Sequence, residues 1–206
     1  MTINYPNGIP KRYQKEEKIK KKQKPSFSNR GMSFEEFINQ SNLYYLSKEM
    51  AVVHKKPTPI QIVHVNYPNR SAAVITEAYF REASTTDYNG VYKGRYLDFE
   101  AKETKNKTSF PLHNFHAHQI KHMKQCINHH GIVFVLIWFS SLQRCFFLSA
   151  NHVIDYWENS DTQRKSLPLK MIENYGYEIQ LGVAPIVPYL SIIDHYILKG
   201  DSIYEK

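Results

Sequence analysis

The chain has 206 residues, of which 42% are hydrophobic and 14% aromatic, and it carries a formal net charge of +8. This length and composition predict one globular domain with a sizeable core. No run of 18 apolar residues occurs and no apolar segment follows the N-terminus, which excludes a membrane-spanning helix and argues against a signal peptide. The two cysteines, Cys126 and Cys145, lie outside any CxxC pair, which argues against a disulfide framework and favours reduced thiols in a cytoplasmic protein.

The positive charge is concentrated near the start of the chain. Residues 1–30 contain nine of the 27 lysines and arginines but only two of the 19 acidic residues, so the remainder is nearly neutral. Residues 1–29 have charge runs, prolines and little periodicity, and we expect a flexible basic arm before a single domain over residues 30–206. A DNA-binding arm and a solubilising tail both fit; the net charge favours an acidic partner such as nucleic acid.

The first helix is predicted within residues 31–55. Ser33 is placed to cap it, and Glu36 at the third helical position completes a capping box. Apolar residues at helical spacing predict its buried face: Phe34, Phe37, Ile38 and Leu43. Glu35 either points towards an active centre or stabilises the helix dipole, as acids in a first turn do.

A pair of strands is predicted next, after a short strand at residues 51–53. Residues 60–67 alternate as a strand, residues 68–71 carry a turn signal, and residues 72–80 can return as the partner strand. The pair forms either a projecting hairpin with basic residues at its base and tip or two strands of the main sheet. A hairpin packed only by its own strands is marginally stable, so a projecting one needs support.

An acidic cluster follows. Successive strand side chains point to opposite faces, so residues 92–103 predict one face that carries Tyr96, Asp98, Glu100 and Lys102. Glu100 and Lys102 then lie about 7 Å apart along the strand. Asp87 precedes a turn signal at residues 89–90, and a hairpin there brings Asp87 back beside Glu100.

Two close carboxylates with a lysine suit Mg²⁺-dependent phosphodiester hydrolysis. Mg²⁺ prefers carboxylate oxygens, water and substrate phosphate, and it makes its bound water more acidic. Two such carboxylates repel each other unless a cation sits between them. Lys102 could orient the attacking water or neutralise charge in the transition state. A solvated strand face with an ordinary Glu/Lys pair fits the same short pattern.

The rest of the chain predicts alternating helices and strands. A helix is expected at residues 114–130, ended by Gly131. Residues 131–139 form a continuous apolar run, typical of a strand buried on both faces, with residues 144–150 as its antiparallel neighbour. Further helices are expected at residues 151–160, 169–175 and 188–199.

The predicted helix at residues 114–130 and its approach are rich in histidine: His113, His116, His118 and His122. His118 and His122 have i,i+4 spacing, yet no acid or thiol completes a recognised zinc spacing. Surface or DNA-facing histidines are therefore favoured over a zinc site. Gln119 lies between them and could reach the acidic cluster.

Several motifs together resemble one family. They are NYPNG, NRGM, HKKPTPIQIVHVNYP, AYFREASTTDYNGVYKGRYLDFEAKETKNKTSFPL and HQIKHMK, in this order over nearly the whole chain. They look like the RecU-type Holliday junction resolvases of Gram-positive bacteria. The resemblance implies an α/β fold of the PD-(D/E)XK nuclease superfamily, with a restriction-endonuclease-like mixed sheet flanked by helices. It also implies a projecting β-hairpin stalk, here at about residues 57–76.

The resemblance also implies the site residues. By motif match, Asp87, Glu100 and Lys102 are catalytic, and Thr85 and Gln119 complete the metal environment. Thr85 is a poor Mg²⁺ ligand through its hydroxyl alone and would act through its carbonyl or through water. Glu35 resembles the first-helix acid of related archaeal resolvases. The candidate DNA contacts are basic residues before the first helix and around the hairpin: Arg30, Lys55, Lys56 and Arg70.

The implied activity is paired nicking of a four-way DNA junction by a homodimer. Each site would bind one or two Mg²⁺, with Mn²⁺ as a substitute, and would leave 5′ phosphate and 3′ hydroxyl ends. Strand annealing, contact with RecA and cooperation with the RuvAB branch-migration machinery are further implied roles, all in recombination and repair in the cytoplasm, at the nucleoid. Two rivals fit parts of the pattern: a duplex nuclease of restriction type and a non-catalytic DNA-binding module.

Overall fold

The computed structural model describes residues 32–81, 85–159 and 165–199, so the predicted arm at residues 1–29 lies outside the described residues. Within them a six-stranded sheet has the order β1-β4-β5-β7-β8-β10. Its strands are β1 (Val52–Lys55), β4 (Tyr88–Tyr92), β5 (Arg95–Thr104), β7 (Ile132–Phe139), β8 (Arg144–Ser149) and β10 (Tyr177–Ile179). β5 and β7 are parallel and the other neighbours are antiparallel, so the sheet is mixed.

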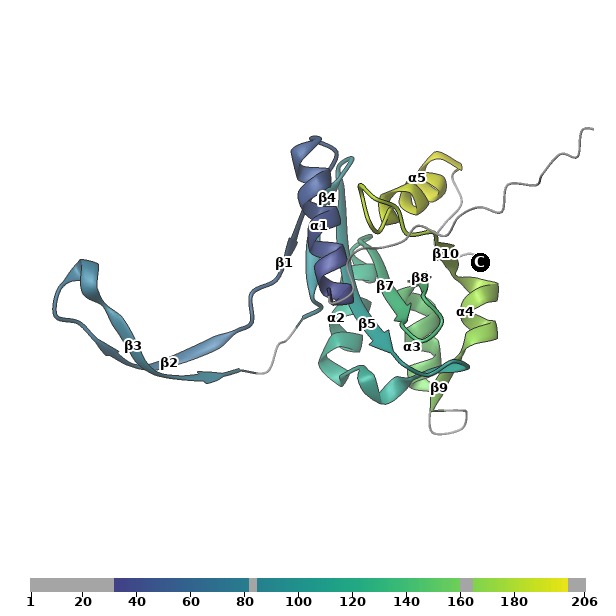
Figure 1. The fold of residues 1–206 in the computed structure, drawn as a ribbon. Helices are drawn as coiled ribbons and strands as arrows, with labels where there is room; N and C mark the ends of the chain where they lie inside the picture. The colour runs from purple at the N-terminus through teal and green to yellow at the C-terminus, as the bar shows by residue number, and fades with distance from the viewer. Residues whose placement is uncertain (1–31, 82–84, 160–164, 200–206) are drawn as a thin grey trace, which may run out of the picture. The chain divides into compact units, whose positions relative to one another are not determined.

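Helices cover both faces of this sheet (Figure 1). On one face, buried side chains of β7 and β8 pack with those of α2 (Ala117–Asn128), α3 (Ala150–Glu158) and α4 (Leu169–Tyr175). The other face is covered by α1 (Phe34–Ser47) and α5 (Tyr189–Lys199). Every residue of β7 is buried, because a central strand with helices on both sides has no solvent face.

A row of stacked aromatic rings forms the core beneath α1 and α5. Tyr88, Phe99, Phe134 and Phe147 come from four neighbouring strands, with ring centroids 4.8, 4.6 and 4.3 Å apart. Tyr189 of α5 packs on Phe99 at 5.2 Å. Phe99 belongs to the apolar face of β5, so the carboxylates of its neighbours point to the opposite face, towards α2.

The predicted first helix and the later helices and strands are present. Ser33 caps α1 by accepting a hydrogen bond from the Glu36 N–H at 3.2 Å. Leu43 was expected in the buried face of α1 and is 65% exposed instead, while Tyr45 takes the buried position. Three features were not predicted from the sequence: the small sheet of β6 (Ser109–Pro111) and β9 (Ser166–Pro168), the 3₁₀ turn η2 (Leu112–Asn114), and β10.

The turn predicted at residues 89–90 is wrong. Both residues lie inside β4, and the chain turns at Lys93 and Gly94, which have positive φ of 48° and 73°. Gly90 serves close packing instead: a Cβ there would lie 2.2 Å from the carbonyl oxygen of Val52 in β1. The β4–β5 hairpin nevertheless forms, with its turn four residues later than predicted.

β2 (Ile60–Asn66) and β3 (Val74–Phe80) form a separate two-stranded sheet, joined through the short 3₁₀ turn η1 (Arg70–Ala72). Every residue of β3 is exposed, and so are all residues of β2 except the half-buried Val65. The pair is therefore a projecting hairpin and not part of the main sheet (Figure 1). Its base is closed by the Arg81 N–H, which donates to the Pro59 carbonyl at 2.9 Å.

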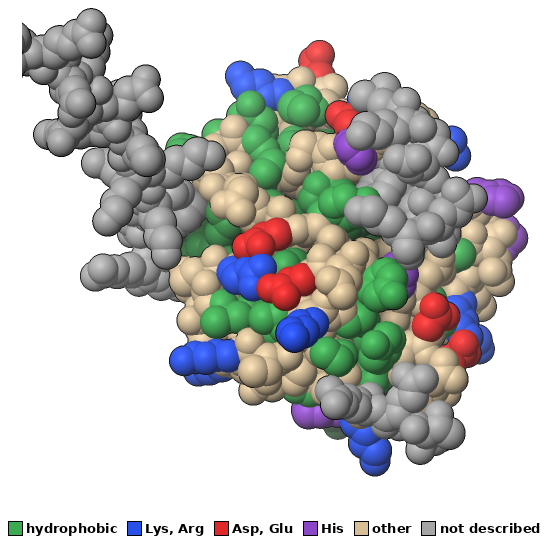
Figure 2. Space-filling model, turned by 90° about the vertical axis from the view of Figure 1, so that its right-hand side faces the viewer, with side chains coloured by type: hydrophobic (Ala, Val, Ile, Leu, Met, Phe, Trp, Pro, Cys, Tyr) green, Lys and Arg blue, Asp and Glu red, His purple; other side chains and the backbone are tan. Residues whose placement is uncertain are grey.

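The side of the molecule that carries α4 and α5 shows acidic and basic side chains close together (Figure 2). Arg144 of β8 pairs there with Glu173 of α4 and with Glu178 of β10, both at 2.6 Å. Basic side chains paired in this way do not form a uniformly positive surface. Among the described helices, none has the length and apolar character needed to cross a bilayer.

Candidate active site

The β4–β5 hairpin brings Asp87 beside Glu100. Tyr88 lies opposite Phe99 in this antiparallel pair, so Asp87, the residue before Tyr88, comes beside Glu100, the residue after Phe99. The Asp87 N–H donates to Glu100 Oε2 at 3.1 Å, and the Ala101 N–H donates to Asp87 Oδ2 at 3.2 Å. These two backbone bonds fix both carboxylates at the same edge of the hairpin.

Two further side chains hold the carboxylate of Glu100, which is fully buried. Lys102 Nζ lies 2.7 Å from Glu100 Oε1, and the Gln119 side-chain amide donates to the same oxygen at 2.6 Å. Oε1 of the same Gln119 amide accepts a hydrogen bond from the His116 backbone N–H at 3.0 Å, as part of the capping box of α2. The helix start therefore aims Gln119 at β5.

Burial and the neighbouring acid change the protonation of this site. Loss of solvent, followed by repulsion from Asp87, raises the pKa of Glu100 to about 8, against the opposing effect of Lys102. A carboxylate in this position is unfavourable as an anion without more positive charge nearby. A cation between Asp87 and Glu100 would supply that charge, and a divalent ion with oxygen preference fits such a donor set.

A second polar cluster lies two residues earlier on the same face of β5. Asp98 is fully buried, and its Oδ2 receives Lys56 Nζ at 2.8 Å, Tyr96 Oη at 2.9 Å and His122 Nε2 at 3.2 Å. The Thr86 hydroxyl donates to its other oxygen. The predicted shared face of β5 is thus present, and the donors come from three separate segments of the chain.

Asp98 was predicted on this face from the sequence, but without a role. The signal that could have found its partners is the spacing of Gln119, His122 and Cys126, which lie on one side of a helix at i, i+3 and i+7. Gln119 faces Glu100 and His122 faces Asp98. The helix and the strand therefore run side by side with matched polar residues.

The remaining predicted residues lie around these clusters. Thr85 is half-buried, and its hydroxyl donates to the Thr86 carbonyl at 3.3 Å. Glu35 is exposed in the first turn of α1 and forms an ion pair with Lys55. Lys56 points inward to Asp98, with only 17% of its side chain exposed. Arg70 lies at the tip of the hairpin, and Arg30 lies outside the described residues.

Comparisons with known proteins agree in the family they indicate. The sequence model of the family described as Recombination protein U matches residues 29–195. A protein of Lactiplantibacillus plantarum named Holliday junction resolvase RecU is 57% identical over 99% of this chain and 100% of its own length. A protein of the same name from Bacillus cytotoxicus is 57% identical over 94% of this chain and 98% of its own length. Another from Streptococcus suis is 54% identical over 97% of this chain and 97% of its own length.

Among solved structures, the Holliday junction resolvase Hjc of Archaeoglobus fulgidus aligns with a TM-score of 0.40 at 10% identity, covering 70% of this chain and 94% of that one. The family assignment rests on the sequence matches, which are far above 30% identity over nearly the full length of both chains. The chain belongs to the Recombination protein U family.

Proposed function

We propose that this chain is a structure-selective endonuclease that resolves Holliday junctions in homologous recombination and DNA repair. The relatives that share more than half of its residues carry the name Holliday junction resolvase. The observation that carries the chemistry is the pairing of Asp87 with the buried Glu100, with Lys102 at 2.7 Å from Glu100. Two carboxylates and an ammonium meet at one edge of a hairpin, an arrangement suited to metal-dependent phosphodiester hydrolysis.

Asp87 and Glu100 would hold Mg²⁺, with Mn²⁺ as a substitute. The raised pKa of Glu100 supports this fit, because the site lacks the positive charge that its buried carboxylate needs. When bound, the metal ion polarises the scissile phosphate and acidifies a water molecule. Gln119 would keep Glu100 in its rotamer, and Thr85 would complete the metal environment through its carbonyl or through water.

Lys102 would stabilise the transition state. Its ammonium is held by Glu100 and lies 5.6 Å from the ring centroid of Phe115, so its side chain has few alternative positions. A fixed positive charge beside the reacting phosphate offsets the negative charge that develops there and costs little reorganisation. Water would attack the phosphorus and the 3′ oxygen would leave, giving 5′ phosphate and 3′ hydroxyl ends.

Selectivity for four-way junctions would come from shape. A homodimer with twofold symmetry offers two equivalent sites to two strands of like polarity, which gives paired nicks. The exposed hairpin of β2 and β3 would act as a stalk in the open centre of the junction. Lys55 and Arg70, at its base and tip, would contact phosphates, together with Arg30 and the basic arm. Lys56 would first have to leave Asp98 to do so.

The direct test compares a synthetic four-way junction with its matched linear duplex, each with Mg²⁺ and with EDTA. Paired, Mg²⁺-dependent nicks confined to the junction are expected. Equal cutting of both substrates would identify a duplex nuclease instead. Binding of the junction without cutting, under every metal condition, would identify a non-catalytic module and refute the proposed chemistry.

A further inference from the structure

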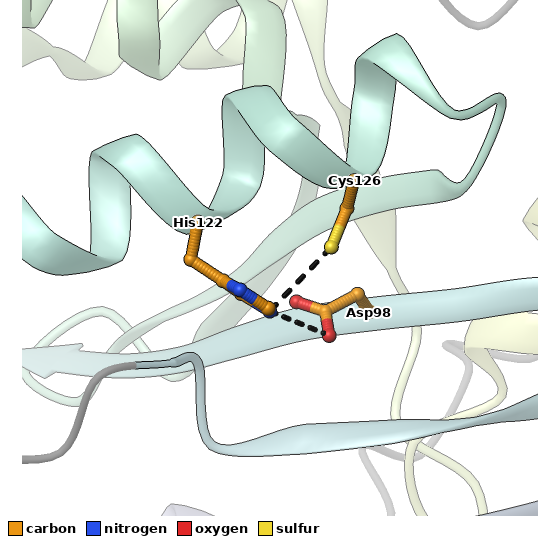
Figure 3. A group of neighbouring side chains, drawn as sticks. All are labelled: Asp98, His122 and Cys126. Atoms are coloured by element: carbon orange, nitrogen blue, oxygen red, sulfur yellow. Dashed lines mark hydrogen bonds and ion pairs between the residues drawn. The ribbon is translucent and has the colours of Figure 1, made fainter.

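A second group of potential metal ligands lies beside the proposed catalytic acids. Among the described residues, Asp98 of β5 and His122 and Cys126 of α2 place one oxygen, one nitrogen and one sulfur atom within 4.8 Å of one another (Figure 3). His122 and Cys126 are four residues apart on the helix, so both side chains point to the strand. We propose that these three residues form a binding site for Zn²⁺, distinct from the Asp87 and Glu100 pair.

The spacing of the three ligand atoms supports a tetrahedral site. Zinc bonds of about 2.0–2.3 Å place two ligand atoms about 3.4 Å apart for nitrogen and oxygen, and about 3.6 Å apart for nitrogen and sulfur. His122 Nε2 lies 3.2 Å from Asp98 Oδ2 and 3.5 Å from Cys126 Sγ. Both distances from His122 are thus close to the required values, and Asp98 Oδ and Cys126 Sγ lie within 4.8 Å of each other. A helix and a central strand carry the three ligands and hold them there.

The ligand chemistry selects zinc over magnesium. Thiolate and imidazole are ligands for soft and borderline ions, whereas Mg²⁺ prefers oxygen. Zn²⁺ would be held by one carboxylate, one neutral imidazole and one thiolate, whose two negative charges balance the ion. The Cys126 thiol would release its proton to solvent on binding. The catalytic pair offers only oxygen ligands, so the two sites differ in the ions they prefer.

A route to the site is also present. A pocket of about 460 Å³ is lined by Tyr96, His122, Gln125, Cys126 and His129. Two of the three proposed ligands line it, so the ion can enter from this side. A water molecule from the pocket would take the fourth coordination position.

Lys56 now occupies the place of the cation. Its ammonium lies 2.8 Å from Asp98 Oδ2 and 3.4 Å from His122 Nε2. Zinc and this ammonium therefore compete for the same two ligands, and zinc binding would release the Lys56 side chain. The Lys56 ammonium also donates a hydrogen bond to the Thr86 hydroxyl at 2.9 Å, and the Lys56 backbone N–H donates one to the Asp87 carbonyl at 2.7 Å. Because these bonds reach Thr86 and Asp87, movement of Lys56 would disturb the position of Asp87. Zinc at this site is therefore expected to inhibit cleavage, a consequence that rests on the proposed function.

The test uses Co²⁺ as a spectroscopic substitute for zinc on the full-length protein without DNA, so it does not depend on cleavage. A thiolate-to-cobalt charge-transfer band is expected, and Zn²⁺ should displace it. Cys126→Ser and His122→Gln should lose the band. Cys145→Ser is the matched control, because Cys145 is the only other cysteine and is fully buried in β8; it should keep the band.

A second control separates the two metal sites. Glu100→Gln removes a proposed Mg²⁺ ligand and should keep the cobalt band, even if the proposed cleavage chemistry is wrong. Lys56→Met removes the competing ammonium, so this variant should bind zinc more tightly than the unmodified chain does. Zinc should also raise the Tm of the variant more than that of the unmodified chain. No thiolate band in the unmodified protein, a band that survives Cys126→Ser, or one that disappears in Glu100→Gln would overturn the proposal.

Discussion

Asp98 and Glu100 are two buried carboxylates on one face of one strand, yet their surroundings are opposite. Asp98 receives donors only: an ammonium, two hydroxyls and an imidazole. Glu100 has an ammonium and two N–H donors but also a second carboxylate, that of Asp87, close enough to raise its pKa. The charge of Asp98 is already balanced by the Lys56 ammonium, so a metal ion there must displace that ammonium. Glu100 lacks enough positive charge and can accept a cation directly.

The largest expected difference is in cleavage. Glu100→Ala or Asp87→Ala should reduce junction cleavage by about 10³-fold or more, because loss of a metal ligand removes several kcal/mol of transition-state stabilisation. Junction binding in a gel-shift assay should be retained. Asp98→Asn is the matched variant and should keep measurable cleavage. Equal loss of cleavage in all three would remove the distinction between the two acids.

The second difference is in stability. Asp98→Ala leaves Lys56 buried without its partner, and breaking such a pair should lower the free energy of unfolding by about 3 kcal/mol. Urea denaturation of the metal-free protein measures this change. The double variant Asp98→Asn with Lys56→Met should recover part of the loss. If Asp98→Ala unfolds at the same urea concentration as the unmodified chain, the cluster does not stabilise the fold.

A smaller effect is expected at Gln119, which touches the metal site only through Glu100. Gln119→Ala should reduce cleavage by roughly 10- to 100-fold, as for other residues that orient a ligand. The half-maximal Mg²⁺ concentration should rise at the same time. Gln125→Ala, on the same helix but outside this contact, is the control; an equal reduction there would indicate a general effect on α2.

The last difference is in pH dependence without metal. The folded-state pKa of Glu100, about 8, lies above its unfolded value, so the folded chain binds the extra proton between those two values. Its contribution to stability is therefore present at acidic pH and is lost as pH rises through about 8, with a slope of at most about 1.4 kcal/mol per pH unit. Comparing urea midpoints across this pH range for the unmodified chain and Glu100→Gln isolates the contribution of Glu100 to stability. An unchanged slope in Glu100→Gln would assign the pH dependence to another group.

Much of the fold could be predicted from the sequence because its elements have strong local signals. β7 is an uninterrupted apolar run, and Ser33 and the phenylalanines after it mark the start of α1. The alternation along β5 correctly placed Asp98, Glu100 and Lys102 on one face. These signals depend on neighbours in the chain, which a single sequence displays.

What failed depends on neighbours in space. Gly90 was predicted as a turn residue because glycine adopts turn conformations easily. A glycine is needed there because the backbone of β1 approaches closely, which no local sequence pattern shows. Leu43 has helical spacing but falls on the exposed side of α1. The group of Asp98, His122 and Cys126 was also missed: Cys126 follows His122 at i+4 spacing in the sequence, but Asp98 comes from a strand that the helix meets only in the fold. The roles assigned to the site residues stay predictions for the experiments above.

The backbone bond between the Lys56 N–H and the Asp87 carbonyl joins two segments with different tasks. Lys56 is the last residue before the prolines that lead into the projecting hairpin, and Asp87, one of the two paired acids, directly precedes β4. A force on the hairpin root therefore reaches Asp87 through one short bond. The bond is a route by which the proposed DNA contact at the hairpin would change the metal affinity of Asp87. By linkage, a metal ion held by Asp87 would then change DNA affinity by the same factor.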